Sequence, residues 1–342
     1  MNRVFKACLI TAVLFSQSSG AQIFTPTPLK VKPKPPQKPV ARPATKPIAA
    51  KPRVKPPKAI QPPVHVKQDW GISATDLDTV EGQVLFNRIK GAEKFEAILT
   101  AANNGDDIAM WLTGIGFLIG THNNGVRDPA LAAKWLKASG EKGNVRAMYG
   151  YAERLRTGDG VSLDLAEAYR WYLQSANAGN GFGIYGLGRA LALGEGVAKN
   201  DALAADWFRR GAVAGNARAM ESYAYDLVSG TGLAVDQPQA VIWYQKAAAM
   251  GDVTAVRNLA ICYHAGRGVG QNYSEAVKWY RRGAEAGDGQ SMFLLATMLA
   301  RGEGVLRDDV EAEKWIRASA DAGFEDAIKA IAEMTRKVGD RK

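Results

Sequence analysis

Cysteine and histidine are scarce in this chain, which has only two cysteines and three histidines among 342 residues. Cys8 lies in a segment that reads as a leader, so only Cys262 would remain after processing and no intrachain disulfide could form. Cys262 and His264 are two residues apart on an expected helix, and they point to different sides of it. Because His122 is the only other histidine in the expected folded part, the sequence predicts no metal site and no cofactor.

Long hydrophobic runs are missing as well. The apolar run over residues 7–15 spans nine residues, whereas a transmembrane helix needs about 20. Basic residues precede this run, and Ser19 and Ala21 follow it as a small-x-small cleavage pattern. We therefore expect a signal peptide over residues 1–21, cleaved after Ala21, and a periplasmic or secreted protein without a transmembrane segment.

Acidic residues are absent from residues 1–68, which contain 13 of the 44 lysines and arginines. That leaves 31 basic against 34 acidic side chains in residues 69–342, so the overall net charge of +10 belongs to the amino-terminal segment. The expected folded part is mildly acidic, which argues against a specific nucleic-acid-binding fold.

Proline is concentrated in the same segment, with 13 of the 15 prolines between residues 22 and 67. Because proline fixes φ and removes an amide donor, and because like charges repel, residues 22–68 should form a disordered Lys/Pro-rich linker. A passive spacer is the simplest interpretation. The alternatives are adhesion to an anionic envelope polymer, lipid or nucleic acid, and a Pro-rich ligand for another domain.

Catalytic signatures are also missing. The chain has no Gly-x-Ser-x-Gly, no phosphate-binding loop and no histidine-based nucleophile pair. Residues 181–186 match the pattern Gly-x-Gly-x-x-Gly, but a dinucleotide site needs a strand before these glycines, and here they fall within an expected helix. We interpret them as a locally weakened helix and predict that the protein is not an enzyme.

What the chain does contain is a tryptophan every 36 residues. Each follows an alanine by three positions and precedes a glycine by eight, and the set is Trp135, Trp171, Trp207, Trp243, Trp279 and Trp315. Repetition at this period is typical of a solenoid, in which each unit buries its apolar face against its neighbours. The fixed phase with small residues favours core packing over a sugar-binding aromatic stripe.

One unit, residues 216–251, shows the expected form. Residues 220–227 carry an apolar helical stripe, Gly230-Thr231-Gly232 breaks that helix, and a second helix carries Trp243 and ends at Gly251. Two such helices joined by a short turn form an antiparallel αα-hairpin. We therefore predict an all-α fold, a right-handed α-solenoid of about six 36-residue hairpin repeats.

These residues resemble the Sel-one-like repeats, a branch of the tetratricopeptide-like α-solenoids. The family pattern is matched by Ala255 to Tyr263, Gly266-Arg267-Gly268-Val269, Trp279-Tyr280 and Gly287-Asp288. The resemblance extends approximately over residues 105–335. The first copy departs from it, because residues 120–126 lengthen its turn.

The expected domain order follows from these patterns and from the need of a solenoid to cover its open ends. It comprises the signal peptide (1–21), the linker (22–68), a divergent amino-terminal helical cap (69–104), the Sel-one-like repeats (105–323), and a carboxy-terminal capping helix and tail (324–342).

Similarity to tetratricopeptide arrays implies a concave groove, lined by first-helix positions at which the repeats differ. These positions are the third, sixth and tenth residues after the repeat glycine, and they are rich in arginine and aromatic residues. The candidate contacts are Arg146, Tyr149, Phe182, Tyr185, Arg189, Arg218, Glu221, Tyr225, Arg257 and Phe293. Ordinary variable surface is the alternative for any one of them.

The predicted function is that of an exported, non-enzymatic scaffold or adaptor that binds a partner protein through this groove. The groove is expected to bind an acidic or aromatic-bearing peptide segment of the partner. One alternative is a protein that binds a cell-envelope polymer through the Lys/Pro-rich linker. A less favoured alternative is an enzyme acting on cell-wall material, which would need a convergent acid–base pair that the sequence does not show.

Overall fold

The computed structural model describes residues 92–120 and 126–339, and in these ranges the chain is entirely α-helical and loop. The expected signal peptide, the linker, the start of the amino-terminal cap and most of the long first turn lie outside the described residues. The helices are α4 (Ala92–Asn103), α5 (Asp107–Ile119), α6 (Pro129–Glu141), α7 (Val145–Thr157), α8 (Leu165–Asn177), α9 (Gly181–Leu193), α10 (Asp201–Val213), α11 (Ala217–Ser229), α12 (Gln237–Ala249), α13 (Val253–Ala265), α14 (Tyr273–Glu285), α15 (Gly289–Arg301), α16 (Asp309–Asp321) and α17 (Glu325–Gly339).

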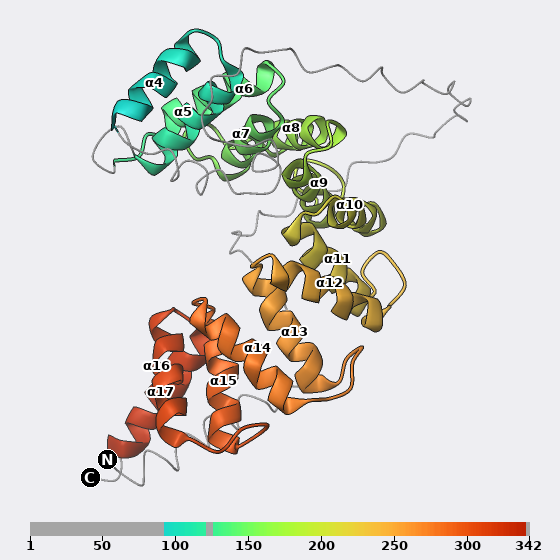
Figure 1. The fold of residues 1–342 in the computed structure, drawn as a ribbon, viewed down its shortest axis with the longest axis vertical. Coiled ribbons are helices and arrows are strands. Elements are labelled where there is room, and N and C mark those ends of the chain that lie inside the picture. The colour runs from blue at the N-terminus through green and yellow to red at the C-terminus, as the bar shows by residue number, and fades with distance from the viewer. Residues whose placement is uncertain (1–91, 121–125, 340–342) are drawn as a thin grey trace, which may run out of the picture.

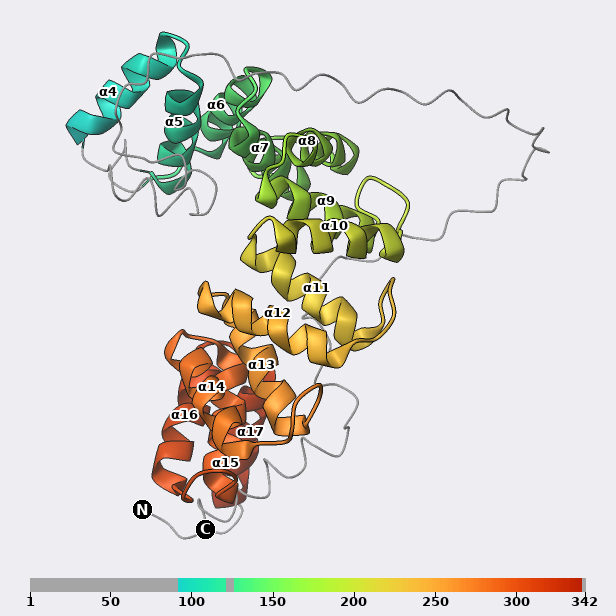
Figure 2. The same ribbon diagram turned by 45° about the vertical axis from the view of Figure 1, so that its right-hand side comes forward.

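The helices from α5 to α16 form six successive hairpins, and each helix packs mainly on the next one in the chain. Figures 1 and 2 show the hairpins stacked one after another along an open arc from α4 to α17. The predicted all-α solenoid of six hairpins is therefore confirmed. No described helix is long and apolar enough to cross a membrane.

Helix boundaries follow from caps that recur in each repeat. The side chain of Asn180 accepts a hydrogen bond from the Gly183 amide at 2.9 Å and so starts α9. At the second glycine of the turn, Gly232 has φ +74°, and a Cβ there would lie 2.2 Å from the carbonyl oxygen of Asp201. This turn therefore contacts the start of the second helix in the preceding repeat, which only glycine permits.

The tryptophans pack against the core, but the side chains that follow them are buried more deeply. Trp171 is 9% exposed and the other five repeat tryptophans are half-buried. Tyr172, Tyr244 and Tyr280 are exposed by at most 1%. These tyrosines fill the space between neighbouring hairpins, while the indoles lie at the edge of the core.

Both ends of the described array are covered by helices. On α4, the Phe95 ring meets Phe117 of α5 edge to face, with ring centroids 5.8 Å apart. On α17, Ala327 and Met334 are buried in the same cluster as Ile316 of α16. The apolar faces of the first and last hairpins are therefore not open to solvent.

Candidate functional site

The first helices of successive repeats form one continuous surface in the amino-terminal half of the array. Helix α7 contacts α9, and α9 contacts α11, whereas successive second helices in the described part make few or no close contacts. Between α7 and α11, this closer packing of the first helices agrees with the bend of the array toward that side in Figure 1.

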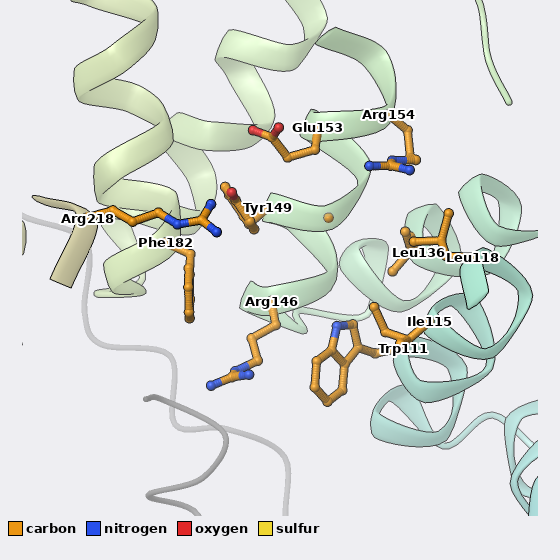
Figure 3. A pocket seen from close by; sticks show the side chains of 11 residues that line it. Trp111, Ile115, Leu118, Leu136, Arg146, Tyr149, Glu153, Arg154, Phe182 and Arg218 are labelled. Atoms are coloured by element: carbon orange, nitrogen blue, oxygen red, sulfur yellow. The ribbon is translucent and has the colours of Figure 1, made fainter. Parts of the chain in front are cut away.

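A cavity of about 270 Å³ opens on this surface between α5, α6, α7, α9 and α11 (Figure 3). Its lining residues are Trp111, Ile115, Leu118, Leu136, Arg146, Tyr149, Gly150, Glu153, Arg154, Phe182 and Arg218. Apolar side chains from α5 and α6 form one wall, and the charged side chains come from α7 and α11.

Arg146 lies between two aromatic rings, with its Cζ atom 5.4 Å from the Trp111 centroid and 5.6 Å from the Phe182 centroid (Figure 3). The side chain is 7% exposed. Its position is fixed at the start of α7, where the Asn144 side chain accepts a hydrogen bond from the Arg146 amide at 3.1 Å. Cation–π attraction to the two rings stabilises the guanidinium between them.

Glu153 is held by three groups behind the cavity. Its carboxylate contacts Arg189 Nη2 at 2.8 Å and Arg156 Nη2 at 2.9 Å, and it accepts a hydrogen bond from the Tyr172 hydroxyl. Burial alone would raise the pKa of Glu153, but these partners outweigh burial and lower the pKa to about 2. The carboxylate is therefore ionised at neutral pH and matched by arginines.

Tyr149 packs between the Tyr172 and Phe182 rings, at centroid distances of 5.9 Å and 5.7 Å. Burial, and then the negative charge of Glu153, raise the pKa of its phenol. Tyr149 is therefore a neutral aromatic contact at physiological pH and not a base.

The structure gathers six of the ten predicted residues around this cavity. Arg146, Tyr149, Phe182 and Arg218 line it. Arg189 lies directly behind them on Glu153, and its guanidinium is 5.9 Å from the Tyr185 ring centroid.

The other four predicted residues lie further along the array. Asn258 Nδ2 donates to Glu221 at 2.9 Å, and Arg257 forms an ion pair with Asp288 at 2.6 Å. Tyr225 is half-buried on α11. Phe293 is only 6% exposed and packs on Phe324, so its ring belongs to the core and offers no contact surface.

Sequence reasoning missed the α5 side of the cavity. The third, sixth and tenth positions were taken only after Gly143 and the later repeat glycines, so the first repeat was omitted. Trp111 and Ile115 are the sixth and tenth residues after Gly105, the repeat glycine of the first repeat. The same count applied to Gly105 would have found both. Gly150 was also missed, because only the third, sixth and tenth positions were compared.

The dinucleotide-like glycines lie in helix α9, as the sequence predicted, and the structure supplies their packing reason. A Cβ at Gly186 would lie 2.5 Å from Cδ1 of Tyr172 on α8. These glycines therefore allow close approach of neighbouring helices.

Cys262 and His264 lie apart from the cavity. Cys262 is buried, and burial raises the pKa of its thiol to about 12. Nδ1 of His264 lies 3.4 Å from the hydroxyl oxygen of Tyr280, and burial lowers the pKa of the His264 imidazole. Within the described ranges, no three residues of the metal-ligating types are placed to hold an ion.

Comparison with known proteins identifies the repeat. Six consecutive segments match the family model described as Sel1 repeat, namely residues 108–144, 145–180, 182–216, 217–252, 253–288 and 289–324. Each segment contains one hairpin, from α5–α6 to α15–α16.

Two solved structures are similar. One is c5321, a protective antigen present in uropathogenic Escherichia coli strains that displays an SLR fold, with 29% identity and a TM-score of 0.60 over 72% of this chain and 56% of that chain. The other is a Sel1 repeat protein from Oxalobacter formigenes, with 30% identity and a TM-score of 0.54 over 64% of this chain and 88% of that chain. The match thus spans little more than half of the first protein. Comparison with curated proteins finds no match.

Proposed function

Because the chain belongs to the Sel1-repeat family, whose members are generally protein-interaction scaffolds, we propose that it is a non-enzymatic scaffold that binds a partner protein. We place the main contact in the cavity between α5, α7, α9 and α11. The supporting observation is an apolar wall that faces three arginines in one cavity of about 270 Å³. Arginine and aromatic side chains are the types enriched in interface hot spots.

The cavity, at about 270 Å³, is large enough to accept one side chain of a partner segment. It lies near the lower end of the range of roughly 300–1,000 Å³ that is typical of pockets for drug-sized ligands. A protein segment that inserts one side chain would continue over the first helices, where Tyr185 and Tyr225 are partly exposed. The cavity would then anchor a longer contact.

We further propose that the protein is exported by the signal over residues 1–21, and that residues 22–68 separate the solenoid from its amino terminus. A second candidate function is attachment to an anionic envelope polymer, favoured by the 11 basic and no acidic residues in 22–68. Deleting residues 22–68 distinguishes the two functions. A scaffold that uses the cavity keeps its partner, whereas a polymer binder loses salt-sensitive attachment.

Site-specific photo-crosslinking in cells tests the location of the contact. Arg218 lines the cavity, and Arg209 is an exposed arginine on α10 that serves as the matched control. With p-benzoylphenylalanine at position 218, we expect one dominant crosslinked protein, which is absent with the same group at position 209. Crosslinking of that protein from position 209 alone would place the contact on the other face.

The crosslinked protein then provides an affinity measurement. We expect Phe182→Ala to weaken its binding about tenfold or more, because the ring both lines the cavity and stacks on Arg146. Arg209→Gln should leave the affinity unchanged. Equal affinity of the Phe182→Ala and wild-type proteins, with native helical spectra, would exclude the cavity as the main contact.

A further inference from the structure

We propose that the cavity binds a phenylalanine side chain of the partner, which takes the place of an aromatic ring that the next repeat supplies from its own chain. This inference rests on the proposed function and names the side chain that anchors the partner segment. It follows from comparison of the cavity, which lies between α5 and α7, with the equivalent space between α7 and α9.

Between α7 and α9 this space is filled by a tyrosine. A large side chain follows each repeat tryptophan, and the set is Leu136, Tyr172, Phe208, Tyr244, Tyr280 and Ile316. The ring centroid of Tyr172 lies 5.9 Å from that of Tyr149 on α7. On the other side, a Cβ at Gly186 of α9 would lie 2.5 Å from the Tyr172 ring. One aromatic side chain from α8 therefore closes the interface between two first helices.

The cavity occupies the equivalent position one repeat earlier. The Tyr172 ring or hydroxyl contacts Tyr149, Glu153 and Arg189. These are the sixth and tenth residues after Gly143 and the tenth after Gly179, and the residues at the same positions one repeat earlier are Trp111, Ile115 and Glu153. All three of these counterparts line the cavity. The cavity is therefore the place of a ring that the first repeat does not provide.

Leu136 takes the position of Tyr172 at this interface and leaves the space partly empty. Its side chain packs toward α5, since a Cβ at Gly114 would lie 2.8 Å from Leu136 Cγ. On the α7 side, a Cβ at Gly150 would lie 3.3 Å from Leu136 Cδ2. A leucine between two glycines thus stands where the next interface has a tyrosine, and a space of about 270 Å³ remains.

The combination of Leu136 and Gly150 is not repeated along the described array. The residues at the position of Gly150, seven after the repeat glycine, are Gly186, Ser222, Asn258, Leu294 and Ala330 in the units that follow. The one other glycine in this set, Gly186, faces the Tyr172 ring. Among the described units, only this interface combines a glycine with an aliphatic residue after the preceding tryptophan.

The lining suits an aromatic ring. Trp111, Ile115 and Leu118 project from α5 on one side of the cavity (Figure 3). A phenyl group placed there buries its apolar area, and its contact with the indole adds a favourable aromatic interaction. The fully buried Leu136 forms the inner wall, so a ring that enters from the first-helix surface points its far edge at an apolar side chain.

The same lining disfavours the hydroxyl of a tyrosine. Between α7 and α9 the Tyr172 hydroxyl donates to Glu153, but the residue equivalent to this acceptor in the cavity is Ile115. The Glu153 carboxylate also lines the cavity, yet it already accepts hydrogen bonds from Arg189, from Tyr172 and twice from Arg156. A carboxylate has about four acceptor sites. A hydroxyl proton at the inner wall would therefore have no acceptor, which costs binding free energy.

Titration of the full chain with three capped tripeptides tests this inference. The peptides are acetyl-Gly-Phe-Gly-amide and its variants with Tyr or Ala in place of Phe. Dissociation constants are measured from the tryptophan indole N–H signals in ¹⁵N-labelled protein, with the Trp111 signal identified through Trp111→Phe. We expect the Phe peptide to shift the Trp111 signal, and to bind about tenfold more tightly than the Ala peptide and about fivefold more tightly than the Tyr peptide.

Leu136→Phe shows whether binding arises in this space, because the variant gives the chain a ring of its own between Gly114 and Gly150. It should weaken binding of the Phe peptide about tenfold or more, while the urea midpoint of unfolding stays the same or rises as the cavity is filled. Gly150→Leu, which introduces the residue type that Leu294 has at the equivalent position, should weaken binding similarly. Gln245→Phe adds the same ring to the exposed face of α12 and should leave binding at the wild-type value.

Equal binding of the Phe and Ala peptides would overturn the inference, and so would equal binding of the Phe and Tyr peptides. Wild-type affinity for the Phe peptide in Leu136→Phe and Gly150→Leu proteins that keep native helical spectra would place the binding outside the cavity and also overturn it. Failure of all three peptides to bind would do the same, while crosslinking from position 218 decides the proposed function separately.

Discussion

At the scale of single residues, Glu221 and Glu153 are two first-helix carboxyls with opposite pKa shifts. Burial, and then the negative charge of Asp252, raise the pKa of Glu221 to about 8. Arginines lower the pKa of Glu153 to about 2 against the effect of burial. Because each pKa differs from the value of 4.5 for an unperturbed glutamate, each carboxyl makes the stability of the fold depend on pH, in opposite directions.

Replacing Glu221 with Gln should stabilise the protein at alkaline pH. The folded state binds the proton of Glu221 more tightly than the unfolded chain, so this contribution to stability is complete below about pH 4.5 and is lost as the pH rises through about 8. Since Glu221 is partly exposed, we expect Glu221→Gln to raise the free energy of unfolding by roughly 2 kcal/mol at pH 9 and by much less at pH 4.5.

Urea denaturation at both pH values measures this effect, with Glu285→Gln on the exposed face of α14 as the control. The Gln side chain can still accept the hydrogen bond from Asn258. A Glu221→Gln protein that is less stable than the wild type at pH 9 would show that the ionised carboxylate is a favourable partner of the groups around it.

Replacing Glu153 with Gln should have the opposite pH dependence. At pH 7 the substitution leaves Arg189 and Arg156 without their carboxylate, at a cost of roughly 2–3 kcal/mol in the free energy of unfolding. The wild-type contribution is present above about pH 4.5 and is lost as the pH falls through about 2. The difference between the two proteins, followed by urea denaturation, should therefore shrink steadily below pH 4.5.

At the scale of helices, the residue after each tryptophan determines how the hairpins pack. Tyr244 is fully buried, whereas Trp243 is half-buried. We expect Tyr244→Ala to lower the free energy of unfolding by about 3–5 kcal/mol and Trp243→Ala by about 1–3 kcal/mol. Chemical denaturation of the two single variants measures both decreases in the free energy of unfolding. A larger decrease for Trp243→Ala than for Tyr244→Ala would contradict the observed packing.

Glycines inside the first helices give a second test of close packing. Alanine at Gly186 gains up to about 1 kcal/mol of helix propensity, but its Cβ would overlap the Tyr172 ring, at a cost of about 1–3 kcal/mol. We expect a net loss of stability in thermal unfolding. Gly150→Ala is the matched comparison, because its nearest neighbour is the movable Leu136 side chain at 3.3 Å, and it should change stability little.

Much of the helix arrangement could be predicted from the sequence. The 36-residue period, the paired glycines and the alanine–tryptophan phase predicted the hairpins and the face of each helix that is buried. They did not show that Tyr172 lies deeper than Trp171. Successive residues of a helix are turned by only about 100°, so both belong to one apolar stripe, and their depth depends on the neighbouring hairpin.

The candidate site could be predicted only in part, for similar reasons. Because the first turn is longer, Gly143 follows Gly105 by 38 positions. A strict 36-residue count back from Tyr149 therefore misses Trp111, which is found only by counting from Gly105. Phe293 occupies the same repeat position as Tyr149, yet the end of the array covers it with Phe324. Exposure at one repeat position depends on the curvature and on the ends of the array, which the repeat pattern does not encode.

At the scale of the whole molecule, the two partner sites that we propose are the first helices of the solenoid and, as the alternative, the basic residues 22–68, which lie outside the described residues. The cavity lies near one end of the array, since α5, α7, α9 and α11 belong to the first four hairpins. Solenoid repeats contact mainly their neighbours, so we expect partner binding there to affect the last two hairpins little.

Hydrogen–deuterium exchange of the full chain, with and without the crosslinked partner, tests the central proposal most directly. We predict slower exchange in α5, α7, α9 and α11 and unchanged exchange in α14 and α16. Protection confined to the second helices or to residues 22–68, with the first helices unchanged, would contradict a partner site in the cavity.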